Sequence, residues 1–448
     1  MNITLKVDKV YEADIVVCGG GVSGIATAIS ASRNGANVVL LEAGNCLGGT
    51  ATEGLVGPFM TCYDVENENQ IIKGLFDDIV SRLIEKDGAI HPSQCKGSDA
   101  YSAYRWHGHY GVTPFSHETL KRVTEQMCLE AGVKIFYHTT LIDCATEGDK
   151  IKSVYAYGGE ELIKINAKAF ADCTGKAYLA KKAGADVYYG NEDGEVQPSS
   201  LFFVVSGVDK KLLDKNAKTY DRDMVTLFHM KEIEKARKEG KFSSGTLKTR
   251  MFMNPDGETW TVNMAQENDE FNQFSAESIS NVEISQREQV EEIIAFLKTL
   301  EPFKNVKLVK TADKIGIRES RRMRSIKKFT LADIESGSKH QDRIAKCANS
   351  VDVHLKEGVN YITNKKCNYY IPLSCMISKD FINLMGVGKC IDADRYAFGA
   401  VRVMTPCIAM GQAAGITLAK AVKENRAIKD VNVKEVQQKL VEQGAIID

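Results

Sequence analysis

A glycine-rich segment between two apolar runs is the feature that most restricts how this chain can fold. Residues 13–17 form a strand-like apolar run, residues 18–24 read Cys-Gly-Gly-Gly-Val-Ser-Gly, and an Ala- and Ser-rich stretch typical of a helix extends to Arg33. A second apolar run, 37–41, ends at Glu42. Strand, G-x-G-x-x-G, helix, strand and acidic residue, in this order, predict a nucleotide-binding βαβ unit.

Each spacing in this pattern has a physical reason. Gly19 lets the chain turn tightly out of the strand, Gly21 lets the backbone approach a pyrophosphate, and Gly24 lets helix and strand pack closely. The helix N-terminus offers unpaired N–H groups and a partial positive charge to phosphates. Glu42 can accept hydrogen bonds from both ribose hydroxyls and would repel a 2′-phosphate. The segment therefore predicts a dinucleotide site.

A glycine doublet after Glu42, Gly48-Gly49, indicates which dinucleotide binds. Residues 46–52 read Cys-Leu-Gly-Gly-Thr-Ala-Thr. An NAD domain usually continues here into an ordinary helix, whereas a flavin lies deeper and needs a second close approach of the backbone. The doublet favours a flavin, and a plain loop is the alternative interpretation.

Composition narrows the class of protein. The chain has 448 residues, 44% hydrophobic and 26% charged, with a net charge of −1, which excludes a strongly polycationic nucleic-acid binder. Its 12 cysteines form no C-x-x-C pair, so we expect reduced thiols in a cytoplasm and no zinc module or other metal site. No signal peptide is evident at the N-terminus. The apolar stretch 403–422 contains Pro406, Gln412 and Lys420 and is predicted to be a buried helix, so no membrane association is expected.

Hydrophobic periodicity places the remaining elements. Helices are expected at 71–86, 118–131, 221–239, 285–299 and 407–423, and strands at 133–138, 139–146, 151–157, 161–165, 167–172 and 381–387. The predicted fold is α/β, with a Rossmann-like FAD-binding domain (a parallel sheet plus an antiparallel meander) and an inserted α+β substrate or cap domain. The FAD-binding domain is assigned to 1–75, 115–190 and 370–448, and the cap to 76–114 and 191–369.

Several segments together carry a family resemblance. They are 14–24, 47–55, 171–175 (Ala-Asp-Cys-Thr-Gly), 316–322 (Gly-Ile-Arg-Glu-Ser-Arg-Arg), 383–388, 401–404 and 410–415. The chain resembles the two-domain FAD-dependent oxidoreductases of the glutathione-reductase flavin fold, and most of all a bacterial group within them. Fumarate reductase and thiazole-synthase flavoproteins are distant relatives.

The resemblance implies a set of cofactor contacts. Gly19, Gly21, Val22, Ser23 and Gly24 would hold the FAD pyrophosphate, Glu42 the ribose, and Leu141 the adenine. The other implied contacts are Gly48, Gly49 and Thr50 along the pyrophosphate and flavin, Thr174 and Gly175 over the dinucleotide, and Gly388 and Met404 at the flavin.

Two positions depart from the family pattern. Ala43 stands where many relatives have Arg or Lys, which removes a side chain that could stack on adenine. Gly388-Lys389 replaces the Gly-Asp that binds the ribityl hydroxyls, so Asp392 is the candidate for that role.

Missing motifs limit the chemistry. There is no C-x4-C pair for a disulfide reductase, no second dinucleotide fingerprint for NAD(P)H, and no histidine after the doublet for a covalent flavin. We expect an oxidoreductase that moves electrons between noncovalent FAD and a small organic substrate, with an unknown second electron partner. The alternatives are an RNA-modifying flavoprotein that uses the basic stretch 314–328, and a flavin monooxygenase.

Three residues are candidates for catalysis. Arg318 belongs to a cluster of six basic residues between 318 and 328. This cluster is either a solvated helix face or a source of arginines, Arg318 or Arg322, for a substrate carboxylate. Arg402, four residues before Pro406, would stabilise a reduced flavin or a substrate oxyanion, or form a structural ion pair. His109, which alternates with His107, is a candidate acid/base, with a surface or core histidine as the alternative.

Overall fold

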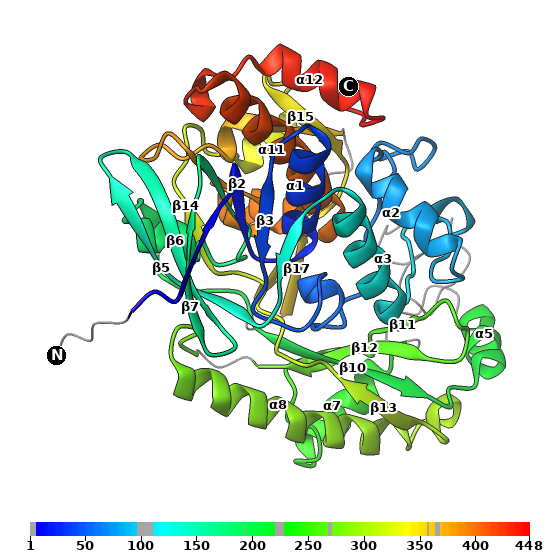
Figure 1. Ribbon diagram of the computed structural model, residues 1–448. Coiled ribbons are helices and arrows are strands. Elements are labelled where there is room, and N and C mark those ends of the chain that lie inside the picture. The colour runs from blue at the N-terminus through cyan, green and yellow to red at the C-terminus, as the bar shows by residue number, and fades with distance from the viewer. Residues whose placement is uncertain are drawn as a thin grey trace.

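A five-stranded parallel sheet lies at the centre of the computed structural model, which describes residues 6–95, 111–191, 193–219, 228–267, 271–355, 358–362 and 368–448 (Figure 1). The strand order is β19 (Leu384–Gly386), β8 (Ala169–Asp172), β2 (Ile15–Cys18), β3 (Val38–Leu41) and β4 (Lys134–Phe136). Every neighbouring pair is parallel. Strands 13–17, 37–41 and 167–172 of the sequence prediction are confirmed within one or two residues.

The two faces of this sheet bury different residues, as the alternation of side chains along a strand requires. Ile15 and Val17 belong to a core with the helices α1 (Val22–Arg33) and α11 (Met404–Glu424). Val16 and Cys18 face a core with the antiparallel meander. Burial on both faces explains why these strands are apolar throughout rather than alternating in polarity.

The meander is confirmed and has one additional strand. It consists of β5 (Thr139–Glu147), β6 (Lys150–Gly158) and β7 (Glu161–Asn166), which pair antiparallel, and of β1 (Lys9–Glu12), which pairs parallel to β7. In Figure 1 it lies to the left of the central sheet.

A second, antiparallel sheet lies at the bottom of Figure 1, lined by α7 and α8. Its order is β11 (Met251–Met253), β12 (Trp260–Gln266), β10 (Ser200–Ser206) and β13 (Lys307–Thr311). Its helices are α5 (Lys210–Thr219), α7 (Met230–Lys238) and α8 (Ala276–Leu297). Apart from Leu55, the buried members of its hydrophobic core come from residues 201–315. The mixed α/β class with parallel and antiparallel sheets, predicted from the sequence, is thereby confirmed.

The remaining elements complete the packing around the parallel sheet. The helices are α2 (Leu75–Ile84), α3 (His117–Glu130), α4 (Tyr178–Ala183), α9 (Leu331–Ser336), α10 (Arg395–Val401) and α12 (Val433–Glu442). Two-stranded pairs are formed by β9 (Val187–Tyr189) with β14 (Arg321–Met323), β15 (Arg343–Cys347) with β18 (Tyr369–Pro372), and β16 (Val351–Leu355) with β17 (Gly358–Ile362). Apolar side chains of α2 and of β15, β16 and β18 join the same core as α1 and α11.

Several helix boundaries differ from the sequence prediction. Helix α8 begins nine residues before the predicted start, because Ser275 caps it by accepting the N–H of Ser278, a signal that the apolar pattern does not contain. Only Met230–Lys238 of the helix expected at 221–239 is observed, and 220–227 lie outside the described residues. Helix α11 begins at Met404, three residues earlier than expected, and is buried along most of its length. Among the described helices, none combines the length and apolar composition that crossing a bilayer requires.

Helix α11 packs against α1 with no room for side chains at its glycines. A Cβ on Gly411 would lie 2.5 Å from the carbonyl oxygen of Ser23, and one on Gly415 would lie 2.5 Å from that of Thr27. Both distances are far below van der Waals contact, so glycine at these positions sets how closely the two helices approach.

Gly411→Val should therefore destabilise the fold. Overpacking of a close helix contact costs about 1–3 kcal/mol, and here the obstacle is backbone, which cannot rotate away. The midpoint of urea unfolding, followed by circular dichroism, should fall relative to Lys423→Val, a control on an exposed position of the same helix. Equal midpoints would show that α1 and α11 can separate at no cost.

Candidate functional site

A cleft of about 460 Å³ opens where β2, β3 and β8 end. This position follows from parallel strand direction, since the carboxyl ends of these strands meet at one edge of the sheet. Most of the predicted cofactor contacts line the cleft: Gly19, Gly21, Val22, Ser23, Glu42, Gly49, Thr50, Leu141, Thr174, Gly175 and Met404.

The three glycines of the G-x-G-x-x-G motif differ in the atoms that surround them. Gly19 has φ +102°, and a Cβ there would lie 2.6 Å from the carbonyl oxygen of Cys173. A Cβ on Gly24 would lie 1.8 Å from the oxygen of Gly19, so this position is closed by packing. A Cβ on Gly21 would meet nothing within 4 Å, so this glycine leaves open space in the cleft. This pattern fits a tight turn and a close helix contact around one position left open for a ligand.

Helix α1 presents its N-terminus to this space. Gly21 is its N-cap residue and supplies no side chain to bond the first N–H groups, and Gly21, Val22 and Ser23 all line the cleft. An uncapped helix N-terminus with open space before it suits a phosphate group. Helix α11 likewise has no side-chain cap, and its first residue, Met404, lines the same cleft.

Glu42 is buried, and its carboxylate links two backbone segments at the edge of the cleft by hydrogen bonds. Its Oε2 accepts the N–H of Gly20 and its Oε1 accepts the N–H of Gly44, both at 2.7 Å. A carboxylate has about four acceptor positions, so each oxygen retains one for a ribose hydroxyl. The donor and acceptor chemistry of the cleft therefore fits the adenosine end of FAD.

Four predicted contacts do not line the cleft. Gly24, Gly48 and Gly388 support its walls: Gly48 has φ +111° and donates its N–H to Gly20 (2.9 Å), and a Cβ on Gly388 would lie 2.6 Å from Ser23 Oγ. Asp392 is buried elsewhere, where it accepts the hydroxyl of Tyr188 (2.9 Å) and the N–H of Ser325 (3.0 Å). This placement gives no support to a role of Asp392 at ribityl hydroxyls.

Lys389 occupies the wall where that role was expected. Its Nζ donates to the carbonyl oxygen of Ile317 (2.7 Å), and the side chain lines the cleft. Burial lowers the pKa of Lys389 to about 8. The ammonium is therefore largely charged at pH 7 and largely neutral at pH 9.5.

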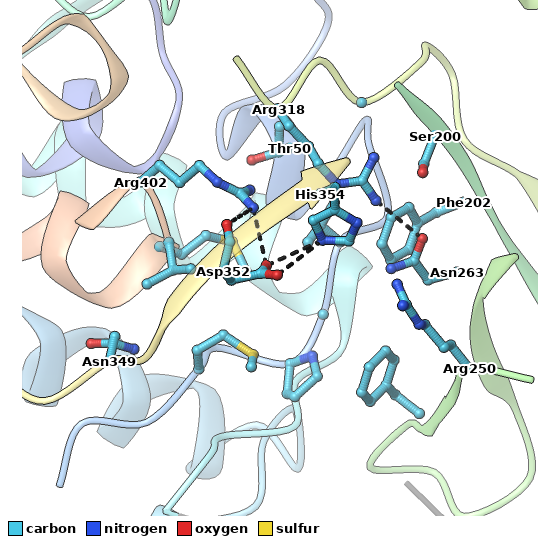
Figure 2. A pocket seen from close by; sticks show the side chains of 18 of the residues that line it. Thr50, Ser200, Phe202, Arg250, Asn263, Arg318, Asn349, Asp352, His354 and Arg402 are labelled. Carbon is cyan, nitrogen blue, oxygen red and sulfur yellow. Dashed lines mark hydrogen bonds and ion pairs between the residues drawn. The ribbon is translucent and has the colours of Figure 1, made fainter. Parts of the chain in front are cut away.

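A second, smaller cavity of about 190 Å³ shares part of its wall with the cleft. The residues common to both are Thr50, Ile317, Lys389, Arg402 and Met404. The other wall comes largely from β10, β11, β12 and β16 and carries several polar side chains: Ser200, Arg250, Asn263, Arg318, Asp352 and His354 (Figure 2).

Arg402, Asp352 and His354 are joined in a row in this cavity, as the dashed lines of Figure 2 show. Arg402 Nη2 lies 3.0 Å from Asp352 Oδ2, and His354 Nε2 lies 3.1 Å from Asp352 Oδ1. Burial opposes ionisation of Asp352, but His354, Arg402 and Arg318 outweigh it and hold the pKa of the carboxyl well below its usual range. Burial lowers the pKa of His354 despite the neighbouring carboxylate, so the ring is neutral at pH 7. Arg402 thus forms the ion pair of the structural interpretation, and it also lines both cavities, so its role at the flavin or substrate stays a prediction.

The basic cluster at 318–328 is not a solvated helix face. Residues 321–323 form strand β14, and Arg322 is only 1% exposed, with bonds to the carbonyl oxygens of Gly190 and Ala393 and an ion pair with Glu319. Arg318 is also buried, but it lines the smaller cavity, where Nη1 donates to Pro198 (2.6 Å). Of the two arginines, only Arg318 is placed to meet a ligand.

The predicted acid/base His109 lies outside the described residues, as does His107. Arg250, Asp352 and His354 were not predicted. One signal for two of them existed: Val351 and Val353 are core residues, so the alternation along β16 places Asp352 and His354 together on its other face. Arg250 had no such signal. In the described part of the chain, no cluster of His, Cys, Asp and Glu could hold a metal ion.

The fold and the cleft define a dinucleotide-binding flavoprotein with a second sheet beside its cofactor site. The chain belongs to the FAD dependent oxidoreductase family, whose family model matches residues 14–440. It is therefore an enzyme that uses FAD.

Solved structures with a similar fold are distant in sequence, and no curated protein matches the chain. A geranylgeranyl bacteriochlorophyll reductase-like protein from Thermoplasma acidophilum is 13% identical, with a TM-score of 0.48 over 98% of this chain and 85% of that chain. The p-nitrophenol 4-monooxygenase of Pseudomonas putida is 11% identical, with a TM-score of 0.48 over 98% and 87%. The flavin-dependent brominase Bmp2 is 10% identical, with a TM-score of 0.47 over 96% and 83%. Similarity at this level assigns no substrate to this chain.

Replacing Glu42 tests the register of the nucleotide. Glu42→Ala should weaken FAD binding by about one to two powers of ten, since hydrogen bonds to a charged group contribute roughly 1.5–3 kcal/mol. Titration of the apoprotein with FAD, followed by flavin fluorescence, measures this affinity. Glu85→Ala, at an exposed position, is the control, and an unchanged affinity of the Glu42 variant would place the ribose elsewhere.

Lys389 predicts a pH dependence of cofactor binding. Its positive charge favours the anionic pyrophosphate below a pKa of about 8 and is lost above it, so FAD affinity should fall between pH 7 and 9.5. In Lys389→Met this part of the pH dependence should be absent, and the affinities of the two proteins should converge at high pH. Parallel curves for the two proteins across this range would contradict the assignment.

Proposed function

We propose that this enzyme transfers electrons between noncovalently bound FAD and a small organic acid that binds as a carboxylate in the smaller cavity. FAD occupies the larger cleft, and the wall common to both cavities is where the flavin and the substrate meet. When bound, FAD supplies a two-electron acceptor or donor. The residues of the chain bind, orient and shield the substrate from water.

Arg250 is the observation that carries the carboxylate assignment. Its side chain is 92% buried (8% exposed) and lines the smaller cavity, and its buried Nε has no hydrogen-bond partner. Within the described part of the chain, no carboxylate pairs with it, and it carries no dashed line in Figure 2. A buried guanidinium without a counter-ion is costly for a fold, which is the expected arrangement if the counter-ion is the substrate.

The other charges of the cavity favour the same ligand. Arg402 is neutralised by Asp352, and His354 is neutral. Arg250 therefore contributes a positive charge to the cavity that no carboxylate among the described residues balances. Planar guanidinium groups bind carboxylates in fixed geometry.

The size of the cavity limits the substrate. At about 190 Å³ it is below the roughly 300–1,000 Å³ of pockets for drug-sized ligands. Apolar side chains such as Phe202 and Phe252 complete its lining. A small acid with a short apolar portion fits this space better than a polycyclic substrate does.

The alternative of an RNA-modifying flavoprotein receives less support. It depends on the basic stretch 314–328, but Arg318 and Arg322 are buried and Lys314 forms an ion pair with Glu53. The two buried arginines are therefore not available to a phosphate backbone, and the half-exposed Lys314 already has a carboxylate partner.

Domain boundaries and location stay predictions. The separate hydrophobic core of 201–315 supports a substrate domain within 191–369, attached to the FAD-binding domain. The described cysteines are all free thiols, which supports a reducing compartment such as the cytoplasm.

Arg250→Met should weaken binding of small carboxylates by about one to two powers of ten, by loss of charge-assisted hydrogen bonds. Perturbation of the absorbance of bound FAD by acetate, propionate and succinate measures this affinity. Thermal stability should stay equal or rise, because the substitution removes a buried charge and no ion pair.

Arg287→Met is the matched control, since Arg287 pairs with Glu283 on the exposed side of α8. It should leave carboxylate binding unchanged. If none of the acids perturbs the flavin of the wild-type enzyme, the carboxylate assignment is wrong.

A further inference from the structure

His354 lines the cavity that we assign to the substrate, and one of its ring nitrogens has no hydrogen-bond partner. The residue is 4% exposed, its Nε2 lies beside Asp352, and its buried Nδ1 has no hydrogen-bond partner. Its backbone N–H donates to Gln197 Oε1 (3.0 Å), which fixes the strand at this position.

Asp352 determines which nitrogen of His354 carries the hydrogen. An ionised carboxylate only accepts hydrogen bonds, so the neutral ring must place its hydrogen on Nε2. Nδ1 is then left with a lone pair. An acceptor that is buried, oriented by a carboxylate and unpaired is arranged as a general base is.

We propose that His354 is a catalytic residue that takes the hydroxyl proton of a small hydroxy acid at Nδ1, and that Asp352 is the positioning residue that orients its ring. This inference rests on the proposed function, because the acid is held by Arg250 and Arg318. The inference goes beyond the proposed function because it names the substrate group that reacts, a hydroxyl.

The balance of the oxidation requires such a base. The C–H bond of the carbinol carbon breaks, and its hydrogen leaves with two electrons, which oxidised FAD accepts. The O–H bond breaks as well, its proton goes to Nδ1, and a C=O bond forms, so that the product is an oxo acid. In the reverse direction His354 returns the proton.

In the described part of the cavity wall, no other group is suited to this proton. Asp352 is ionised but paired with Arg402, and its pKa lies well below its usual range. Lys389 is protonated at pH 7 and bonded to Ile317. Among the described residues that line the cavity, His354 thus has the one basic nitrogen that is neutral at pH 7.

Charge distinguishes a hydroxyl from an amine as the reacting group. Among the described residues of the cavity wall, the positive groups are Arg250, Arg318, Arg402 and Lys389, and the one carboxylate is Asp352. A 2-amino acid would bring an ammonium group into this excess of positive charge. A hydroxyl is neutral and donates one hydrogen bond to Nδ1.

The first arm of the test measures binding without turnover. Holoenzyme whose FAD has been reduced photochemically under anaerobic conditions cannot oxidise a hydroxy acid, so calorimetry can compare lactate with propionate and malate with succinate. The wild type should bind each hydroxy acid more tightly by roughly two- to tenfold, the value of one hydrogen bond. His354→Phe should lose this preference and still bind propionate and succinate.

The second arm measures flavin reduction by the same hydroxy acids in stopped flow. His354→Phe should slow reduction about 100-fold or more, as loss of a general base does. The groups that face the ring are Asp352 on its own strand, Arg402 after α10, Arg318 before β14 and Arg250 before β11. Asp352 raises the pKa of His354, so Asp352→Asn should shift the acid limb of the pH profile to lower pH and lower the plateau.

His340→Gln is the matched control. His340 also lies beside an aspartate, with Nε2 3.4 Å from Asp333 Oδ1, but it does not line the cavity. It should change neither the hydroxyl preference nor the reduction rate. The visible spectrum of bound FAD shows that each variant is folded.

The outcomes separate the two proposals. If the wild type binds none of the acids, the carboxylate site is wrong and this inference falls with it. If the acids bind but the hydroxyl preference is absent or persists in His354→Phe, only the role of His354 is overturned. The same holds if no hydroxy acid reduces the flavin, or if Asp352→Asn leaves the pH profile in place.

Discussion

The contact between Gly24 and the carbonyl oxygen of Gly19 is the constraint on which the site depends. A Cβ at Gly24 would lie 1.8 Å from that oxygen, so the first turn of α1 can lie against the end of β2 only because the side chain is absent. The same helix touches α11 through Gly411 and Gly415. Three glycines therefore bring two helix N-termini to one cleft, one facing the open space at Gly21 and the other beginning at Met404. The backbone N–H groups of the two helix N-termini therefore give the cleft a partial positive charge, and this contribution requires no charged side chain.

The parts of the fold that the sequence predicted are those with a local cause. The nucleotide-binding unit at 13–42 has glycine positions fixed by backbone geometry, and the meander has strands separated by glycine turns, so both are recognised from neighbours in the chain. The sheet formed by β10 to β13 was missed, because its strands are separated by helices and by long segments and pair only in three dimensions. Arg318 was found because it stands in a dense cluster of basic residues, whereas Arg250, which lines the same cavity, stands in no such cluster.

Asp392 was predicted from its spacing to lie at the ribityl hydroxyls, but it does not line the cleft. It was chosen because a carboxylate was expected near Gly388, but the turn after Gly388 sends it toward Tyr188 and Ser325. The cleft receives Lys389 instead, a group of opposite charge that bonds to Ile317. Counting residues locates a position along the chain, while the direction of a side chain depends on a turn whose φ of +66° at Gly388 the sequence alone did not reveal.

The common wall of the two cavities has a consequence for how this enzyme can diverge. Thr50, Lys389, Arg402 and Met404 face both the cleft and the smaller cavity, so a substitution among them alters two binding equilibria at once and is rarely neutral for either. Arg250, Phe202 and Asn263 face only the smaller cavity and are carried by the sheet of the second core. Substitutions in the wall that faces only the smaller cavity can therefore change substrate preference without changing FAD binding. Gene duplicates of this enzyme should therefore vary in β10 to β12 while their nucleotide-binding half stays the same.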